Sequence, residues 1–309
     1  MGRIRMKQVE GLGNVTIETA IEEFLKNCRL RNLSPKTIRY YEEDLQYFAR
    51  NIPAKNADDI NRKVVDDFIF HEMDKGNRIT AINTRLRGIR VFIRFCSERD
   101  YSEGFSYPLL KEDETVKEPY TEEELQRLLR RPASNSWAEW RVWAAINTFL
   151  ATGVRASTLL SIRISDVDFE HNTILLKKLK NRKQQMIPVS ESLGNVLNDY
   201  LKLWDWNIED YLFPTITNTQ MNVHSLESAV RKYNIARGVS KTSLHLFRHT
   251  FAKNYVLAGG GMIQLQSILG HSTLEMTRKY IHLYGQDIHR DFDKLNPLNN
   301  MLNKKNARR

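Results

Sequence analysis

The sequence predicts a mainly α-helical protein with a small antiparallel β-sheet, organised as an N-terminal helical domain followed by a C-terminal mixed α/β domain. Apolar residues recur at helical spacing along most of the 309 residues. Strand-like runs are short and are confined to residues 167–189. Between the two halves, residues 104–120 break the periodicity and carry two prolines and several charges, which is typical of a domain boundary.

Four helices are expected in the N-terminal domain. The first has apolar residues on one face between residues 17 and 28. The second begins at Ser34, because serine caps helix N-termini and the proline that follows suits the first helical position. The third covers residues 62–75 and ends at Gly76, and the fourth begins near Thr80 with an apolar stripe of its own.

The fourth helix also carries three arginines beside its apolar stripe, Arg87, Arg90 and Arg94. Their spacing of three and four residues puts them on one helical face. Such a face fits a DNA groove, and it equally fits a charged surface exposed to solvent. The helix alone leaves both interpretations open.

The C-terminal domain is expected to begin with a capping box formed by Thr121 and Glu124. A helix then covers residues 137–151, is stopped by Thr152-Gly153, and is followed at once by another near Ala156. Three strands of one small antiparallel sheet come next, at residues 167–169, 174–176 and 186–189. The connection between the last two strands is rich in lysine and arginine, and helical patterns return from residue 193.

These patterns divide the chain into four segments. They are a helical domain at 1–110, a linker at 111–120, a mixed domain at 121–297 and a polar basic tail at 298–309. The net charge of +10, from 47 basic and 37 acidic residues, favours an anionic partner such as nucleic acid without identifying one.

Several classes of protein are disfavoured by what the sequence lacks. It has no apolar stretch of roughly 18 residues and no signal-peptide pattern, so we expect a cytoplasmic protein without membrane contact. Cys28 and Cys96 both lie on apolar helical faces and are expected to be reduced core residues. No cysteine–histidine cluster has zinc-ligand spacing, so no metal site is expected.

Six polar residues in the C-terminal domain have the chemistry of a phosphate-transfer site. They are Arg155, Lys180, His245, Arg248, His271 and Tyr280. Arginine binds phosphate oxygens in a bidentate fork and stabilises the charge of a pentavalent transition state. Lysine or histidine can protonate a leaving oxygen, and tyrosine can act as a covalent nucleophile. His271 precedes a second capping box at residues 272–275, so we expect it at the N-terminus of a helix that carries the tyrosine.

In this order and context the residues resemble the tyrosine recombinase, or phage integrase, family, close in layout to Xer-type recombinases and transposon integrases. Arg155 ends an Ala-Thr-Gly-Val-Arg segment, His245 and Arg248 form a His-x-x-Arg pair, and His271 ends Leu-Gly-His. Lys180 matches the hairpin lysine, counted back from Ile187-Pro188-Val189, and Tyr280 matches the nucleophile. The resemblance covers nearly the whole chain.

One position departs from the family pattern, and a second has more than one candidate residue. The family often has an acidic residue three positions after the first arginine, where this chain has Thr158. The hairpin also offers other lysines besides Lys180 as the proton donor, namely Lys177, Lys178 and Lys183.

The resemblance implies a core-binding N-terminal domain and a catalytic C-terminal domain. Lys36 and Thr37, with the three arginines of the fourth helix, would then contact DNA. Tyr280 would form a 3′-phosphotyrosyl link without metal, cofactor or ATP. The partners would be double-stranded DNA with a specific recombination site, three further copies or a paralogous recombinase in a tetramer, and a directionality factor. The segment 286–300 would reach a neighbouring protomer, with Phe292 and Leu295 as anchors.

Two other functions share features of this sequence. A type IB topoisomerase would use the same chemistry to relax supercoils without sequence preference, but the separate N-terminal helical domain favours the recombinase. A DNA-binding protein that has lost catalysis would keep the basic surface, but here all six matched positions are filled. The sequence names neither the DNA site nor the biological role.

Overall fold

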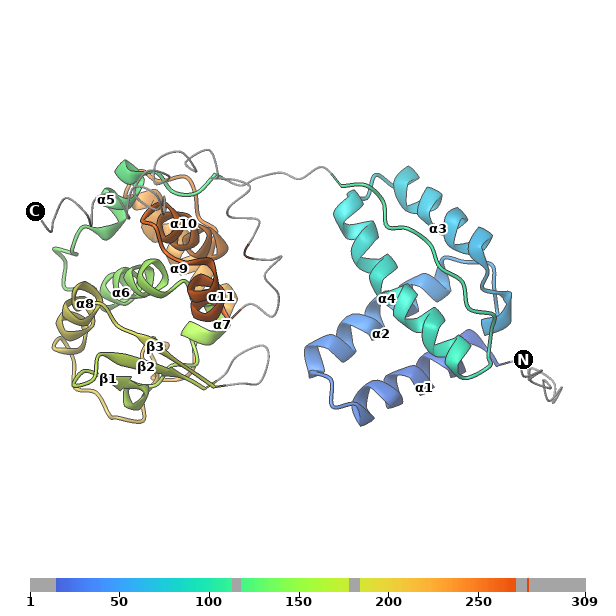
Figure 1. Cartoon of the computed structure of the whole chain (residues 1–309), viewed down its shortest axis with the longest axis horizontal. Coiled ribbons are helices and arrows are strands. Elements are labelled where there is room, and N and C mark those ends of the chain that lie inside the picture. The colour runs from blue at the N-terminus through green and yellow to red at the C-terminus, as the bar shows by residue number, and fades with distance from the viewer. Residues whose placement is uncertain (1–14, 113–117, 178–183, 271–276, 278–309) are drawn as a thin grey trace, which may run out of the picture. The chain divides into compact units, whose positions relative to one another are not determined.

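The computed structural model describes residues 15–112, 118–177, 184–270 and residue 277. The chain forms two compact units, Met1–Thr115 and Val116–Arg309 (Figure 1). The division between them falls inside the predicted linker, residues 111–120, and the other segment limits stay predictions.

The first unit consists, in its described part, of four α-helices and a short 3₁₀ turn. The helices are α1 (Ile17–Leu30), α2 (Pro35–Arg50), α3 (Arg62–Asp74) and α4 (Ile79–Glu98), and the turn is η1 (Ala57–Asp59). Side chains of Thr16, Ser34 and Asn61 accept hydrogen bonds from backbone N–H groups at the starts of α1, α2 and α3. Gly76 has a φ of +75° just after α3, the backbone conformation that a helix-ending glycine adopts.

The core of the first unit lies where α4 packs against the other three helices. Phe24 of α1 makes edge-to-face contacts with Phe92 and Phe95 of α4, at ring-centroid distances of 5.8 and 5.4 Å. Cys28 and Cys96 are buried in the same core, and both are free thiols. The apolar stripes predicted for the first and fourth helices therefore face one another.

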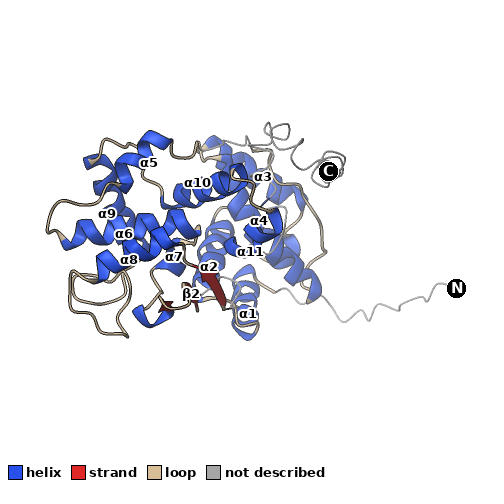
Figure 2. Ribbon diagram, turned by 60° about the vertical axis from the view of Figure 1, so that its left-hand side comes forward, coloured by secondary structure: helices blue, strands red, loops and turns tan. Residues whose placement is uncertain are grey.

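The second unit is built around α6 (Trp137–Thr152), which packs against α5, α8, α9 and α10 (Figure 2). The other helices are α5 (Glu122–Leu129), α7 (Ala156–Leu159), α8 (Glu191–Leu201), α9 (Val223–Ala236), α10 (Leu244–Leu257) and α11 (Met262–Leu269). The capping box predicted for Thr121 and Glu124 is present at the start of α5. Most of α6 is buried, which is why its sequence is apolar on nearly every face.

A three-stranded antiparallel sheet completes the second unit, in the order β1 (Val167–Asp168), β2 (Thr173–Leu176) and β3 (Gln185–Pro188). Ile174 of β2 lies opposite Val167 on one side and Ile187 on the other. A short 3₁₀ turn, η2 (Ile164–Asp166), leads into β1. The predicted fold class, mainly helical with a small antiparallel sheet, is confirmed.

The strand limits differ slightly from those predicted. Phe169 lies beyond β1, because the chain turns there: Asp168 accepts a hydrogen bond from the His171 N–H at 2.9 Å, and Asn172 has a φ of +51°. Val189 lies beyond β3, although its N–H still donates to the Asn172 carbonyl at 2.8 Å.

Candidate active site

The junction between α6 and α7 places Arg155. Gly153 ends α6 in the left-handed conformation, with a φ of +62°, and a Cβ there would lie 2.4 Å from the Phe251 ring and 2.7 Å from a Leu269 methyl group. Glycine is therefore required both by the backbone and by the packing. The chain turns through buried Val154, and Arg155 caps the start of α7.

Arg248, on the second turn of α10, is the most buried of the predicted catalytic residues that the structure describes, with 3% of its surface exposed. Its Nη1 donates to the Gly153 carbonyl and its Nη2 to the Leu269 carbonyl, both at 2.8 Å. Arg155 Nη1 donates to the same Leu269 carbonyl at 3.5 Å. The structure therefore brings the two predicted arginines together at the C-terminus of α11, where the helix dipole favours positive charge.

The β2–β3 pair meets the arginines at the same place. The side-chain amide of Gln185 donates to the Ser267 carbonyl at 2.7 Å and to the Ile268 carbonyl at 3.3 Å. A small cavity beside these contacts is lined by the following residues: Val154, Arg155, Thr158, Leu176, Gln185, Arg248, Ile268 and Leu269. Nothing local in the sequence singled out Gln185 as part of the site.

Thr158 occupies the position where the family pattern often has an acidic residue. It is buried, with 2% of its surface exposed, and it lines the same cavity as Arg155 and Arg248. Its N–H donates to the Arg155 carbonyl at 3.0 Å, so it also shapes the short turn that carries this arginine. The position therefore remains next to the arginines, with a hydroxyl in place of a carboxylate.

His245 lies one helical turn before Arg248 on α10, and it is exposed where Arg248 is buried. Its ring stands perpendicular to that of His249, with 4.5 Å between the ring centroids. The exposed imidazole is accessible to a ligand, whereas Arg248 is buried and lines the small cavity.

Three predicted site residues, Lys180, His271 and Tyr280, lie outside the described residues, as does the capping box expected at 272–275. The described chain leads directly to His271: α11 ends at Leu269, and Gly270 follows in the left-handed conformation with a φ of +59°. Because Leu269 accepts hydrogen bonds from both arginines, the Leu-Gly-His segment begins at the arginine pair.

Lys177, one of the other hairpin lysines, has a structural partner. Its Nζ lies 2.5 Å from a carboxylate oxygen of Asp166, whose side chain is only 1% exposed. A buried carboxylate is costly without a counter-charge, so Lys177 compensates the charge of Asp166. This partner makes Lys177 a poor candidate for the proton donor. Lys178 and Lys183 lie outside the described residues.

Three buried tyrosines in the described part of the second unit do not have the properties of a nucleophile. Burial raises the pKa of Tyr120, Tyr200 and Tyr233 well above the usual range, which makes their phenols harder to deprotonate. The hydroxyls of Tyr120 and Tyr233 donate to backbone carbonyls, at Lys241 and Leu128. These residues belong to the core.

The residues predicted to contact DNA in the first unit lie at the surface, and most have partners within the unit. Arg87 lies 3.7 Å from Glu112, and Arg94 lies 3.4 Å from Glu98. Arg90 instead donates to the Tyr107 carbonyl and stacks on the Tyr107 ring, 5.2 Å from its centroid. On α2, Lys36 is exposed, whereas the Thr37 hydroxyl lies 2.7 Å from that of the capping residue Ser34.

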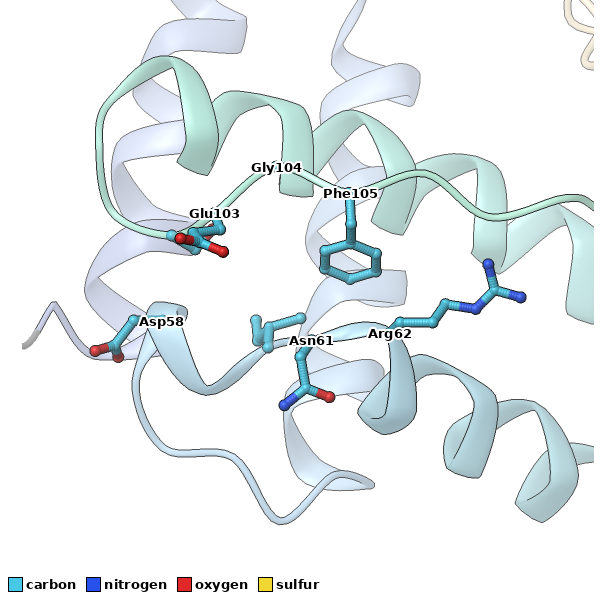
Figure 3. Close-up of a pocket in the computed structure, with 8 residues that line it drawn as sticks. Asp58, Asn61, Arg62, Glu103, Gly104 and Phe105 are labelled. Carbon is cyan, nitrogen blue, oxygen red and sulfur yellow. The ribbon is translucent and has the colours of Figure 1, made fainter.

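A separate pocket of about 270 Å³ lies in the first unit, between the start of α3 and the segment after α4 (Figure 3). The Phe105 ring points into it, and Asp58, Asn61 and Glu103 line its edge (Figure 3). Arg62 is held there by Asp66 at 2.8 Å. Of the predicted catalytic residues that the structure describes, Arg155, His245 and Arg248, none lines this pocket.

Within the described ranges, no three histidine, cysteine or acidic side chains gather as they would around a metal ion. No helix found in those same ranges has the length and apolar character needed to cross a membrane.

Arg155 and Arg248 thus meet at one carbonyl, and Arg248 shares its helix with His245. Two family models match most of the chain. The model described as "Phage integrase family" matches residues 119–287, and the model of the phage integrase N-terminal SAM-like domain matches residues 21–100. The chain belongs to the phage integrase family of tyrosine recombinases.

Similar proteins span nearly the same length. Tyrosine recombinase XerC of Thermodesulfovibrio yellowstonii is 25% identical over 295 residues, which cover 90% of this chain and 96% of that protein. Tyrosine recombinase XerD of Staphylococcus haemolyticus is 26% identical over 298 residues, which cover 91% of this chain and 99% of that protein.

Three solved structures share the fold. The Tn1549 transposon integrase in complex with transposon right end DNA has a TM-score of 0.74 and 21% identity, covering 86% of this chain and 94% of that one. A lambda integrase dimer bound to a COC′ core site has a TM-score of 0.71 and 16% identity, covering 86% and 95%. A lambda integrase tetramer bound to a Holliday junction has a TM-score of 0.68 and 16% identity, covering 87% and 78%.

Proposed function

We propose that this recombinase cleaves and rejoins DNA at a specific site through a covalent link between Tyr280 and a 3′ phosphate. The observation that carries the proposal is the meeting of Arg155 and Arg248 at the Leu269 carbonyl, two residues before His271. The guanidinium groups of both arginines are thereby held in one place by the fold, which is what a transition-state phosphate requires.

In the proposed cleavage step the Tyr280 oxygen forms a bond to phosphorus and the bond from phosphorus to the 5′ oxygen breaks. Lys180 gives a proton to the leaving 5′ oxygen, and His245 assists removal of the tyrosine proton. Arg155, Arg248 and His271 bind the non-bridging oxygens. In the rejoining step a 5′ hydroxyl from the partner strand attacks the phosphotyrosyl link and releases Tyr280.

Because one phosphate ester replaces another, the chemistry needs no ATP. In the proposed site the charge of the transition state is stabilised by arginine and histidine side chains in place of a metal ion. The proposed partners are double-stranded DNA with a recombination site and three further protomers, either copies of this chain or a paralogous recombinase, with a directionality factor as an additional partner. The tetrameric lambda integrase complex and the DNA-bound transposon integrase support this assembly by their fold. We place the activity in the cytoplasm.

The test is covalent capture on a nicked duplex. The DNA site is first selected from fragments of the source genome by binding to the full chain, and the nick lets the cleaved end diffuse away. Wild type, Tyr280→Phe and a matched control, Tyr211→Phe, are incubated with this duplex in EDTA and resolved on a denaturing gel.

We expect a protein–DNA adduct with wild type and Tyr211→Phe and none with Tyr280→Phe. An adduct with Tyr280→Phe would show that another residue is the nucleophile. No adduct with any variant, despite binding, would favour a catalytically silent DNA-binding protein. Relaxation of a plasmid that lacks the selected site would instead favour a topoisomerase.

A further inference from the structure

Gln185 makes a contact that joins the β-hairpin to the helix that precedes His271. Its amide donates to the carbonyls of Ser267 and Ile268, at 2.7 and 3.3 Å. These carbonyls belong to the last turn of α11, where helical N–H partners run out. The Ser267 carbonyl also accepts from the backbone N–H of Gly270, at 2.9 Å. The next carbonyl, that of Leu269, accepts from Arg248 and Arg155. A single helical turn therefore binds the hairpin and both arginines.

The contact lies at the end of the β2–β3 pair. Gln185 is paired with Leu176, the last pair before the connection between the strands, and Leu176 is buried beside the same cavity. The next residue on the other strand, Lys177, is fixed by its ion pair with Asp166. Both strands are thus attached to the rest of the unit at the points where residues 178–183, including Lys180, join them.

We propose that Gln185 is a positioning residue for the proton transfer to the leaving 5′ oxygen. By holding the end of β3 against the C-terminus of α11, it fixes the point from which the segment with Lys180 leaves the hairpin, close to Arg155 and Arg248. A displacement of about 1 Å in such an arrangement costs on the order of 100-fold in rate. The inference rests on the proposed function, which assigns the proton to Lys180.

A purely structural role for Gln185 makes a different prediction. If its amide served only to cap α11, its loss would disturb Arg155 and Arg248 as well, and cleavage would slow whatever the leaving group. If it positions Lys180, only the reactions that need a proton at the leaving atom should slow.

The experiment compares two nicked duplexes in single-turnover cleavage with the full chain in excess. One has the natural 5′ oxygen at the scissile phosphate, and the other has sulphur at that position. A thiol has a pKa of about 8.5, so a thiolate leaves without a proton from the enzyme. The variants are Gln185→Ala, Gln185→Arg, which keeps donors for both carbonyls, Lys180→Ala, and the exposed neighbour Gln184→Ala as the matched control.

We expect Gln185→Ala to cleave the oxygen substrate at least about tenfold more slowly and the sulphur substrate at nearly the wild-type rate, with DNA affinity unchanged. Gln185→Arg should recover most of the lost rate, and Gln184→Ala should behave as wild type. An equal slowing on both substrates, or no slowing at all, would overturn the inference about Gln185.

Lys180→Ala tests the assignment on which the inference rests. Its cleavage rate should fall by about 100-fold or more on the oxygen substrate and return close to the wild-type rate on the sulphur substrate. If the sulphur substrate does not rescue Lys180→Ala, the assignment of the proton donor is wrong. Lys180→Ala could show the expected loss on oxygen and recovery on sulphur while Gln185→Ala cleaves both substrates at the wild-type rate. That result would support the proposed proton donor and rule out only the positioning role of Gln185.

Discussion

Arg248 connects three segments of the second unit through two hydrogen bonds. Its guanidinium joins α10 to the carbonyl that ends α6, at Gly153, and to the carbonyl that ends α11, at Leu269. Such bonds fix the side chain before any DNA binds, so little rotamer entropy remains to be lost when a phosphate arrives. The same bonds mean that Arg248 contributes to folding as well as to chemistry.

Replacing Arg248 with alanine should separate DNA binding from cleavage. We expect Arg248→Ala to retain binding, because most affinity comes from many phosphate contacts, and to cleave about 10²–10³-fold more slowly. Single-turnover cleavage and a gel-shift titration measure the two effects. A cleavage rate within about tenfold of wild type, equivalent to about 1.4 kcal/mol, would remove Arg248 from the catalytic set.

The stability of Arg248→Ala should be measured alongside, since the substitution removes a donor from the Gly153 carbonyl and leaves the Leu269 carbonyl with only the longer bond from Arg155. Each lost partner costs roughly 1–3 kcal/mol. Urea denaturation then shows whether the folded fraction under assay conditions is close to that of wild type, so that the cleavage rates compare folded enzymes.

Among the elements, the junction of α6 and α7 has the least tolerance for change. We expect Gly153→Ala to destabilise the protein by about 2–5 kcal/mol, because the left-handed backbone costs an L-residue roughly 1–2 kcal/mol and the added methyl group overlaps Phe251 and Leu269. Urea denaturation of the full chain is the measurement.

Gly259 provides a matched control for this substitution in the same unit. It also has a positive φ, of +84°, but a Cβ there would meet nothing within 4 Å. Gly259→Ala should therefore lower the free energy of unfolding only by the roughly 1–2 kcal/mol that the left-handed backbone costs an L-residue. Equal losses for the two variants would show that packing at Gly153 is unimportant.

The arginines of α4 should differ in their contribution to DNA binding. Arg87 and Arg94 are exposed and form ion pairs with Glu112 and Glu98. Each substitution by glutamine should therefore lower the salt dependence of binding by about one unit of slope. Arg90 is bound to Tyr107, so Arg90→Gln should mainly reduce stability. Binding titrations at several salt concentrations measure the slopes, with Arg131→Gln of the second unit as control.

The elements themselves could be predicted closely because their signals are local. Ser34 and Thr121 cap helices within three residues of their partners, and Gly153 stops α6 at the position expected. The contacts that assemble the site could not be predicted in this way. Gln185 and Ser267 are 82 residues apart, and Lys177 pairs with Asp166 across a turn, so no periodicity or spacing in the sequence encodes either contact.

For the whole molecule, the expected assembly on DNA depends on the segment after Tyr280, which lies outside the described residues. A chain that ends at Gln286 should keep its fold and its binding to a single duplex but lose much of its tetramer formation. A chain that lacks only residues 298–309 is the control and should still assemble. Native gels on paired duplexes measure this, and unchanged tetramers from the shorter chain would refute the role of Phe292 and Leu295.

The packing of α11 has a consequence for temperature. Among the described residues, its buried Leu265 and Leu269 form a small cluster with Ala252 of α10, separate from the main core of the second unit, with Phe251, Tyr255 and Val256 packed against it. Because this cluster is small, we expect local opening of α11 to cost less free energy than unfolding of the unit. In the open form Arg155 and Arg248 lose the carbonyl that they share, and Gln185 loses both of its acceptors. We therefore expect strand cleavage to fail on heating when this one short helix detaches, at a temperature where the rest of the unit is still folded.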